Sequence, residues 1–229
     1  MVQSAPRSLF GALIFVLALV VAGCTEQEQQ GAVEQAQPRY VAIGASDSVG
    51  TGARDPARDG WVPQLHARMP AGTHLVNLGV SGLRMHQALE QSLPIAVDLQ
   101  PSVVTIWLAV NDLAAGVTLD SYQVDLDIML ATLRQQTQAR VYVANLPDLT
   151  YLPAFDNRDR AELSAEVQRW NDAIAASVSA HDVVLVDLYS GWTELRDQQR
   201  NYVSRDGLHP TSRGYRRLAE IFWAAMQGT

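Results

Sequence analysis

A short segment near the carboxyl terminus, RDGLHP, places Asp206 three residues before His209. One turn of chain can bring this carboxylate to the imidazole, where it would fix the tautomer and stabilise the protonated ring. An imidazole has a pKa suited to accepting a proton near neutral pH. His209 is therefore a candidate general base and Asp206 its orienting partner. Pro210 suits the first turn of a helix, so we expect His209 at a helix entrance.

Such a base needs a nucleophile, and the segment GASDSVG at residues 44–50 offers Ser46 and Ser48. A serine hydroxyl attacks efficiently only when an adjacent base removes its proton. Serines in a strand-to-helix turn also commonly cap backbone amides, without any chemical role. The residues alone leave both serines open as the nucleophile.

Two further segments offer hydrogen-bond donors: NLGVSG at residues 77–82 contains two glycines, and AVND at residues 109–112 contains an asparagine. Backbone N–H groups and an asparagine amide can stabilise the oxyanion that forms during acyl transfer. An asparagine after a strand can equally serve as a helix cap. Asn111 is thus a candidate oxyanion donor, and its position in the fold decides between this role and that of a helix cap.

The elements that must position these residues follow from the apolar pattern. Continuous apolar runs are typical of buried parallel strands, and helical periodicity lies between them. Tyr122, Leu126, Met129 and Leu133 share one helical face, and residues 61–69, 159–180 and 210–226 are further predicted helices. The pattern predicts one α/β domain, a three-layer α/β/α sandwich around a parallel sheet of about five strands. Its strands are expected in YVAIGA, HLVNLGV, VVTIWLAV, RVYVANL and VVLVDL.

Each candidate segment follows one of these strands or precedes the last helix, and ligands bind at the carboxyl ends of such strands. The ordered set of serine, glycine, asparagine and DxxH resembles the SGNH, or GDSL-type, hydrolase family from Tyr40 to the end of the chain. The resemblance implies a flavodoxin-like sandwich and serine ester hydrolysis through an acyl-enzyme, without a cofactor or metal. Family members include lipases, lysophospholipases, thioesterases, arylesterases and O-deacetylases of carbohydrates or cell-wall glycans.

The resemblance also assigns roles. When Gly44 and Gly50 are aligned without a gap to the glycines of the family's turn, Ser46 becomes the nucleophile and Ser48 the alternative. His209 becomes the base and Asp206 its orienting partner. Ala45 departs from the family, which usually has aspartate there, and Asp47 is the candidate to replace it.

The oxyanion donors implied by the resemblance are the backbone N–H groups of Ser46 and Gly82 and the side chain of Asn111. Gly79 is the alternative to Gly82. Ala109 stands where the family tends to have glycine. Among the tryptophans, Trp107 is expected to pack inside a strand, whereas Trp61 and Trp192 could line an acyl or sugar pocket.

Composition and missing motifs exclude other classes. The net charge of −7 argues against a nucleic-acid partner. The chain has no lysine, so its 17 basic residues are all arginine, and neither a Walker A site nor a Schiff base is available. The sequence lacks the GxSxG and HExxH motifs and a Cys/His cluster. We expect no cofactor, no metal and a monomer. A non-catalytic binding module stays open because of Ala45.

The amino-terminal segment predicts export and lipid anchoring. Arg7 precedes an apolar stretch at residues 9–22, which is short for a permanent membrane helix. The stretch ends in VAGC, which resembles the lipobox of bacterial lipoproteins, with Cys24 as the lipidated residue. Residues 1–23 are the predicted signal peptide, residues 24–38 a Gln/Glu-rich tether, and residues 39–229 the hydrolase domain. The location implied is the cell envelope: the outer membrane or periplasm in a Gram-negative cell.

Overall fold

The computed structural model describes Met1, Val2 and residues 37–228. The chain divides into two units, residues 1–35 and 36–229, and the fold is that of the second. Cys24 and all of the predicted signal peptide after Val2 lie outside the described residues, as does the tether up to residue 36. In the described ranges, no helix combines the length and apolar character needed to cross a membrane.

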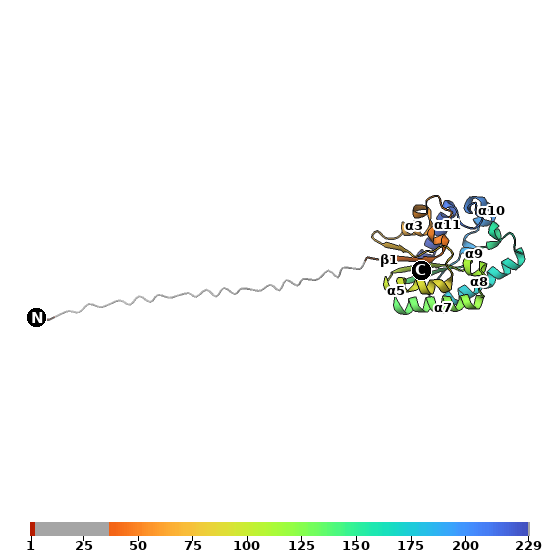
Figure 1. The fold of residues 1–229 in the computed structure, drawn as a ribbon. Coiled ribbons are helices and arrows are strands. Elements are labelled where there is room, and N and C mark those ends of the chain that lie inside the picture. Colours follow the sequence, from red (N-terminus) through yellow and green to blue (C-terminus); the bar gives the residue numbers. More distant parts are fainter. Residues whose placement is uncertain (3–36, 229) are drawn as a thin grey trace. The chain divides into compact units, whose positions relative to one another are not determined.

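A central parallel sheet carries the fold (Figure 1). The spatial order of its five strands is β2-β1-β3-β4-β5, and every neighbouring pair is parallel. Its middle strands are buried, which explains why their sequences are apolar without alternation. The sheet confirms the predicted fold class. The strands are β1 Arg39–Gly44, β2 His74–Asn77, β3 Val103–Trp107, β4 Arg140–Ala144 and β5 Val184–Val186.

Helices cover both faces of the sheet and complete the three layers (Figure 1). Helices α3 and α11 pack together on one face, and α4, α5, α7 and α8 contact one another on the other. The helices are α1 Ser46–Val49, α2 Pro56–Asp59, α3 Trp61–His66, α4 Met85–Gln91, α5 Leu93–Asp98, α6 Val110–Ala114, α7 Leu119–Gln136, α8 Arg160–Ala180, α9 Leu188–Gly191, α10 Glu194–Tyr202 and α11 Ser212–Gln227, with short 3-10 turns η1 Leu149–Tyr151 and η2 Pro153–Phe155.

Side-chain caps fix where the long helices begin. The carboxylate of Asp159 accepts hydrogen bonds from the N–H groups of Ala161 and Glu162, so α8 starts one residue later than predicted. Thr211 caps α11 through the N–H of Gly214, which moves that start to Ser212. The start of α11 places residues 203–211 as a loop at the carboxyl edge of the sheet, where β1 also ends.

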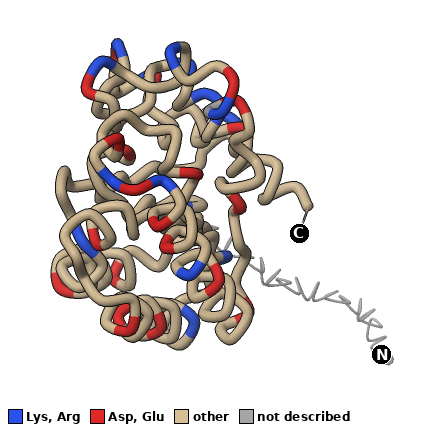
Figure 2. The backbone as a smooth tube through the Cα atoms, turned by 90° about the vertical axis from the view of Figure 1, so that its right-hand side faces the viewer, with Lys and Arg blue, Asp and Glu red and all other residues tan. Residues whose placement is uncertain are grey.

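Charges are interspersed over this fold. Figure 2 shows arginine and acidic positions mixed along the backbone on the face in view. Arg217, for example, pairs with Glu194 at 3.0 Å and with Glu220 at 3.7 Å. Such mixing does not resemble the one-sided basic face with which proteins bind a phosphate backbone.

Candidate active site

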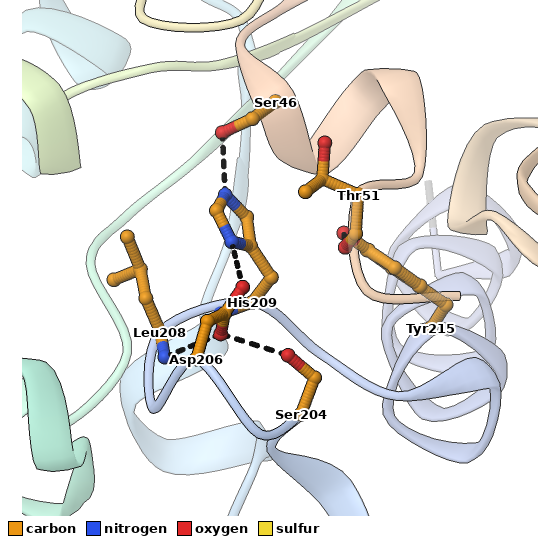
Figure 3. A network of polar contacts seen from close by, with 7 residues as sticks. All are labelled: Ser46, Thr51, Ser204, Asp206, Leu208, His209 and Tyr215. Atoms are coloured by element: carbon orange, nitrogen blue, oxygen red, sulfur yellow. Dashed lines mark hydrogen bonds and ion pairs between the residues drawn. The ribbon is translucent and has the colours of Figure 1, made fainter. Parts of the chain in front are cut away.

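The structure joins three of the predicted residues in one hydrogen-bonded chain (Figure 3). Ser46 Oγ lies 2.8 Å from His209 Nε2, and His209 Nδ1 lies 2.7 Å from Asp206 Oδ2. Ser46 is the first residue of α1, directly after β1, and the other two belong to the loop before α11. The order hydroxyl, imidazole, carboxylate is the one needed to activate a serine.

The turn after β1 separates the two serines. Ser48 is 1% exposed, and a Cβ added to Gly44 would lie 2.0 Å from its hydroxyl. Ser48 is therefore packed under the end of β1, and its Oγ has no hydrogen-bond partner among the described residues. The structure brings Ser46, and not Ser48, to His209. Gly44 is required because any side chain there would occupy the space that Ser48 fills.

The same turn is tied to α11. The backbone oxygen of Ser46 accepts hydrogen bonds from the N–H groups of Gly50 and Thr51, both at 3.0 Å. The hydroxyl of Tyr215, on α11, donates to the backbone oxygen of Thr51 at 2.5 Å (Figure 3). The serine turn and the helix that follows His209 are thus held together independently of the Ser46–His209 contact.

Asp206 is held ionised by its own loop. Partial burial would raise the pKa of Asp206, but hydrogen bonds from the Leu208 N–H, the His209 ring, the Ser204 hydroxyl and the His209 N–H outweigh it and hold this pKa well below its usual value. The Leu208 and Ser204 bonds measure 2.9 and 2.7 Å. The carboxylate can therefore orient the imidazole throughout the neutral pH range.

The predicted oxyanion donors differ in whether their N–H groups already donate a hydrogen bond. Among the described residues, none accepts a hydrogen bond from the N–H of Ser46 or of Gly82. The N–H of Gly79, the alternative, already donates to Asn77 Oδ1 at 3.0 Å. Gly82 has a φ of +79° and is exposed, a conformation that suits glycine. The geometry favours Gly82 over Gly79 as a free donor.

Asn111 belongs to α6, and its amide has one hydrogen free. Asn111 Nδ2 donates to the backbone oxygen of Leu83 at 3.0 Å, one residue after Gly82. The buried carboxylate of Asp112 accepts from the Met85 N–H at 3.1 and 3.2 Å. These bonds fix the Gly82 segment to α6. Asp112 is a site-positioning residue that the sequence analysis missed, although it directly follows Asn111.

A strained backbone turn aims Asn111. Ala109 has φ +75° and ψ −44°, and the N–H of Val110 bonds to the backbone oxygen of Leu108 at 3.0 Å. This is a γ-turn of the strained kind, and non-glycine residues rarely adopt it. Ala109 stands at this turn where the resembling family tends to have glycine, so the departure noted in the sequence falls on a position with a strained backbone.

We expect Ala109→Val to lower the free energy of unfolding by about 2 kcal/mol or more, because a β-branched residue tolerates a positive φ poorly and the site is fully buried. Ala109→Gly should change it by less than about 1 kcal/mol, because relief of strain offsets the greater entropy of the unfolded chain. Urea denaturation of the two variants measures the difference. Equal stabilities would contradict the assignment of strain to this turn.

Asp47 places a second carboxyl group at the site. Burial raises the pKa of Asp47 to about 6, and the neighbouring His209 side chain opposes that shift. A hydrogen bond from its own backbone N–H also opposes the shift, and Asp47 lines the same pocket as Ser46. Ala45, which stands where the family usually has aspartate, is 4% exposed and packs in the core.

A largely apolar pocket opens beside Ser46 and Asn111. Its walls include Trp107, Trp192, Leu149 and Leu152. The expectation that Trp192 could line a pocket is met, whereas Trp61 is fully buried in the core. The sequence predicted that Trp107 packs inside its strand. In the structure it also lines the pocket, at the residue where β3 ends. In the part of the chain that the structure describes, no group of three or more His, Cys, Asp or Glu side chains could hold a metal.

Comparisons with solved structures find the same fold. An acetylxylan esterase from Geobacillus stearothermophilus matches with a TM-score of 0.68 at 17% identity, over 82% of this chain and 93% of that one. The esterase EstA from Pseudoalteromonas matches with a TM-score of 0.66 at 16% identity, over 83% and 97%. TesA matches with a TM-score of 0.65 at 24% identity, over 83% and 98%.

No curated protein sequence matches the chain significantly. The model of the GDSL-like lipase/acylhydrolase family, in contrast, matches residues 42–217, which include Ser46, Asn111, Asp206 and His209. This match spans most of the chain and the whole of the hydrogen-bonded site. The protein is an ester hydrolase that belongs to the GDSL-like lipase/acylhydrolase family.

Proposed function

We propose that this protein is a serine esterase that cleaves carboxylic esters through an acyl-enzyme intermediate. The observation that carries the proposal is the unbroken chain from Ser46 Oγ through the His209 ring to Asp206, with contacts of 2.8 and 2.7 Å. A binding module would have no need to keep an aligned hydroxyl, base and ionised carboxylate beside an apolar pocket.

In the first half-reaction, Ser46 Oγ forms a bond to the ester carbonyl carbon while its proton moves to His209 Nε2. Asp206 holds the opposite ring nitrogen and stabilises the imidazolium. The carbonyl oxygen becomes an oxyanion, for which the free N–H groups of Ser46 and Gly82 and the Asn111 amide are the donors. The tetrahedral species then collapses, the bond to the alcohol oxygen breaks, and that oxygen takes the proton from His209.

In the second half-reaction, water replaces the alcohol. His209 Nε2 accepts a proton from the water as its oxygen bonds to the acyl carbon, and the same three donors stabilise the second oxyanion. Collapse breaks the bond to Ser46 Oγ, which recovers its proton from His209. The acid leaves, and every group returns to its starting state without a metal or cofactor.

The test uses the full chain in mild detergent, with p-nitrophenyl acetate as substrate and a fluorophosphonate as a serine-reactive label. We expect hydrolysis, and mass spectrometry should place the label on the peptide that contains Ser46. A chain that is folded but neither hydrolyses the ester nor takes the label would support the binding module instead. A label on Ser48 would overturn the assignment of the nucleophile.

A second candidate is narrower: removal of acetyl groups from a carbohydrate or cell-wall glycan. One structural neighbour is an acetylxylan esterase, and the pocket beside Ser46 is small. Release of acetate from acetylated xylan, measured against release from p-nitrophenyl acetate, tests this candidate. Acetate release from the glycan that is no faster than the uncatalysed background would exclude this candidate.

We also propose that the protein is anchored to the cell envelope through a lipid on Cys24, the residue that ends the lipobox-like VAGC. The expected result is that wild-type protein sediments with membranes, whereas Cys24→Ala moves most of it to the soluble or uncleaved-precursor fraction. Metabolic labelling with an alkynyl fatty acid should mark only the wild type. Cleaved Cys24→Ala protein that stays with washed membranes would contradict the anchor.

A further inference from the structure

The pocket beside Ser46 is too small for a long acyl chain. Its cavity volume is about 20 Å³, whereas one water molecule needs about 10–15 Å³. A methyl group fits such a space, whereas a chain of several methylenes does not. The volume therefore sets an upper limit on whichever part of the ester enters.

The part that enters is the acyl group. Ser46 and Asn111 line the pocket, so the carbonyl carbon and its oxyanion lie at its wall. His209, which must pass its proton to the alcohol oxygen, is not itself a lining residue, although its neighbours Leu208 and Pro210 are, so it stands at the edge of the pocket. The alcohol therefore leaves on the side away from the pocket, and the substituent on the acyl side points in. The walls consequently restrict the acid and leave the size of the alcohol open.

The wall formed by Trp107 is held in place by aromatic packing. Trp107 meets Trp61 edge to face, with centroids 6.2 Å apart, and Trp61 stacks on Phe222 at 4.3 Å. All three rings are almost fully buried, and moving one would disturb the packing between the sheet and α11. A long acyl chain cannot make room by displacing Trp107. Trp192 lies outside the sheet, after α9, and is the wall that a substitution can remove.

A further wall is polar. The acidic residue Asp47 is among the residues that line the pocket. An alkyl chain packed against it would strip its remaining water without offering a hydrogen bond, which is unfavourable. The pocket thus penalises added methylene groups through its volume and through this carboxyl group.

We infer that this esterase selects short acyl groups, acetyl above all, and that Trp107 and Trp192 set the limit. The inference rests on the proposed function, since it concerns the acyl group held at Ser46. The consequence for substrate class is that the natural ester is an O-acetylated alcohol rather than a fatty-acid ester.

The experiment measures kcat/KM of the full chain on p-nitrophenyl acetate, butyrate and octanoate. We expect a fall of about tenfold or more for each step along the series, in line with the discrimination that one or two methylenes provide in a fitted pocket. Trp192→Leu should raise the butyrate-to-acetate ratio by about tenfold, and Val110→Phe, which fills the pocket, should depress acetate turnover. Trp223→Leu removes an indole that does not line the pocket and should leave the ratio unchanged.

Leu152→Ala is the second enlarging variant, for use if Trp192→Leu does not fold, and should shift the ratio in the same direction. Wild-type turnover of octanoate as fast as acetate overturns the inference and leaves the esterase intact. A fluorophosphonate label on Ser46 without acetate hydrolysis also overturns it. Absence of both labelling and hydrolysis rejects the proposed function, and the inference with it.

Discussion

Ser46→Ala is expected to lower kcat on p-nitrophenyl acetate by about six orders of magnitude, the loss typical when a serine nucleophile is removed from a triad. His209 would still be oriented by Asp206, but no hydroxyl would remain 2.8 Å from its Nε2 to attack the carbonyl. Ser46 is partly exposed on the pocket side, so its substitution should hardly change the melting temperature. Stopped assays on freshly purified protein, with thermal denaturation beside them, measure both quantities.

Ser48→Ala is the matched control two residues away. Its hydroxyl is buried without a partner, so removing it should leave kcat within a few-fold and stability within about 1 kcal/mol. Inactive but folded Ser48→Ala protein, beside active Ser46→Ala protein, would show that the turn has been assigned in the wrong register.

Asp206→Asn should lower kcat by about four orders of magnitude while the loop stays folded. The asparagine oxygen can still accept from the Leu208 N–H and the Ser204 hydroxyl, which hold the loop at 2.9 and 2.7 Å. Its amide would, however, donate to His209 Nδ1 and leave Nε2 carrying the proton. In that tautomer, the imidazole cannot accept the proton of Ser46.

The measurement is kcat from pH 6 to 9, with circular dichroism as the check on folding. Asp197→Asn, which neutralises an exposed aspartate of α10, is the control and should retain full activity. A loss of less than tenfold in Asp206→Asn would show that the carboxylate does not determine the tautomer of His209.

Much of the fold could be predicted from the sequence because the strands are apolar on both faces. Tyr40 to Ile43 are fully buried, and only a strand inside a covered parallel sheet requires such a run. The four site segments follow from the same logic, since the carboxyl ends of the strands meet at one edge. Helix starts were less accurate, because Asp159 and Thr211 cap rather than begin their helices.

Other features depend on contacts between distant elements and leave no mark in the local pattern. The residues alone left Ser46 and Ser48 open, and the family resemblance favoured Ser46; the reason that Ser48 is unsuitable, its close packing against Gly44, is visible only in the fold. The role of Trp107 as a pocket wall follows from where β3 ends, although its residue type predicted only burial. The γ-turn at Ala109 was indicated only by the glycine that the resembling family tends to have there, because alanine itself does not signal a positive φ.

The predicted lipid anchor at Cys24, unlike the fold and the site, is not tested by the structure. It rests on a short amino-terminal pattern and lies outside the described residues, so it stays a prediction until the Cys24→Ala experiment is made. The fold and site of residues 37–228 do not depend on its outcome.

The two halves of the site lie far apart in the sequence. Ser46 and His209 are 163 residues apart, and His209 precedes only α11, the last helix. During synthesis, the base therefore leaves the ribosome long after the nucleophile. Activity requires that the loop before α11 has docked against the serine turn, because only then does His209 lie beside Ser46. Timed hydrolysis after dilution from urea would therefore follow completion of the fold, whereas circular dichroism would also register earlier, inactive stages.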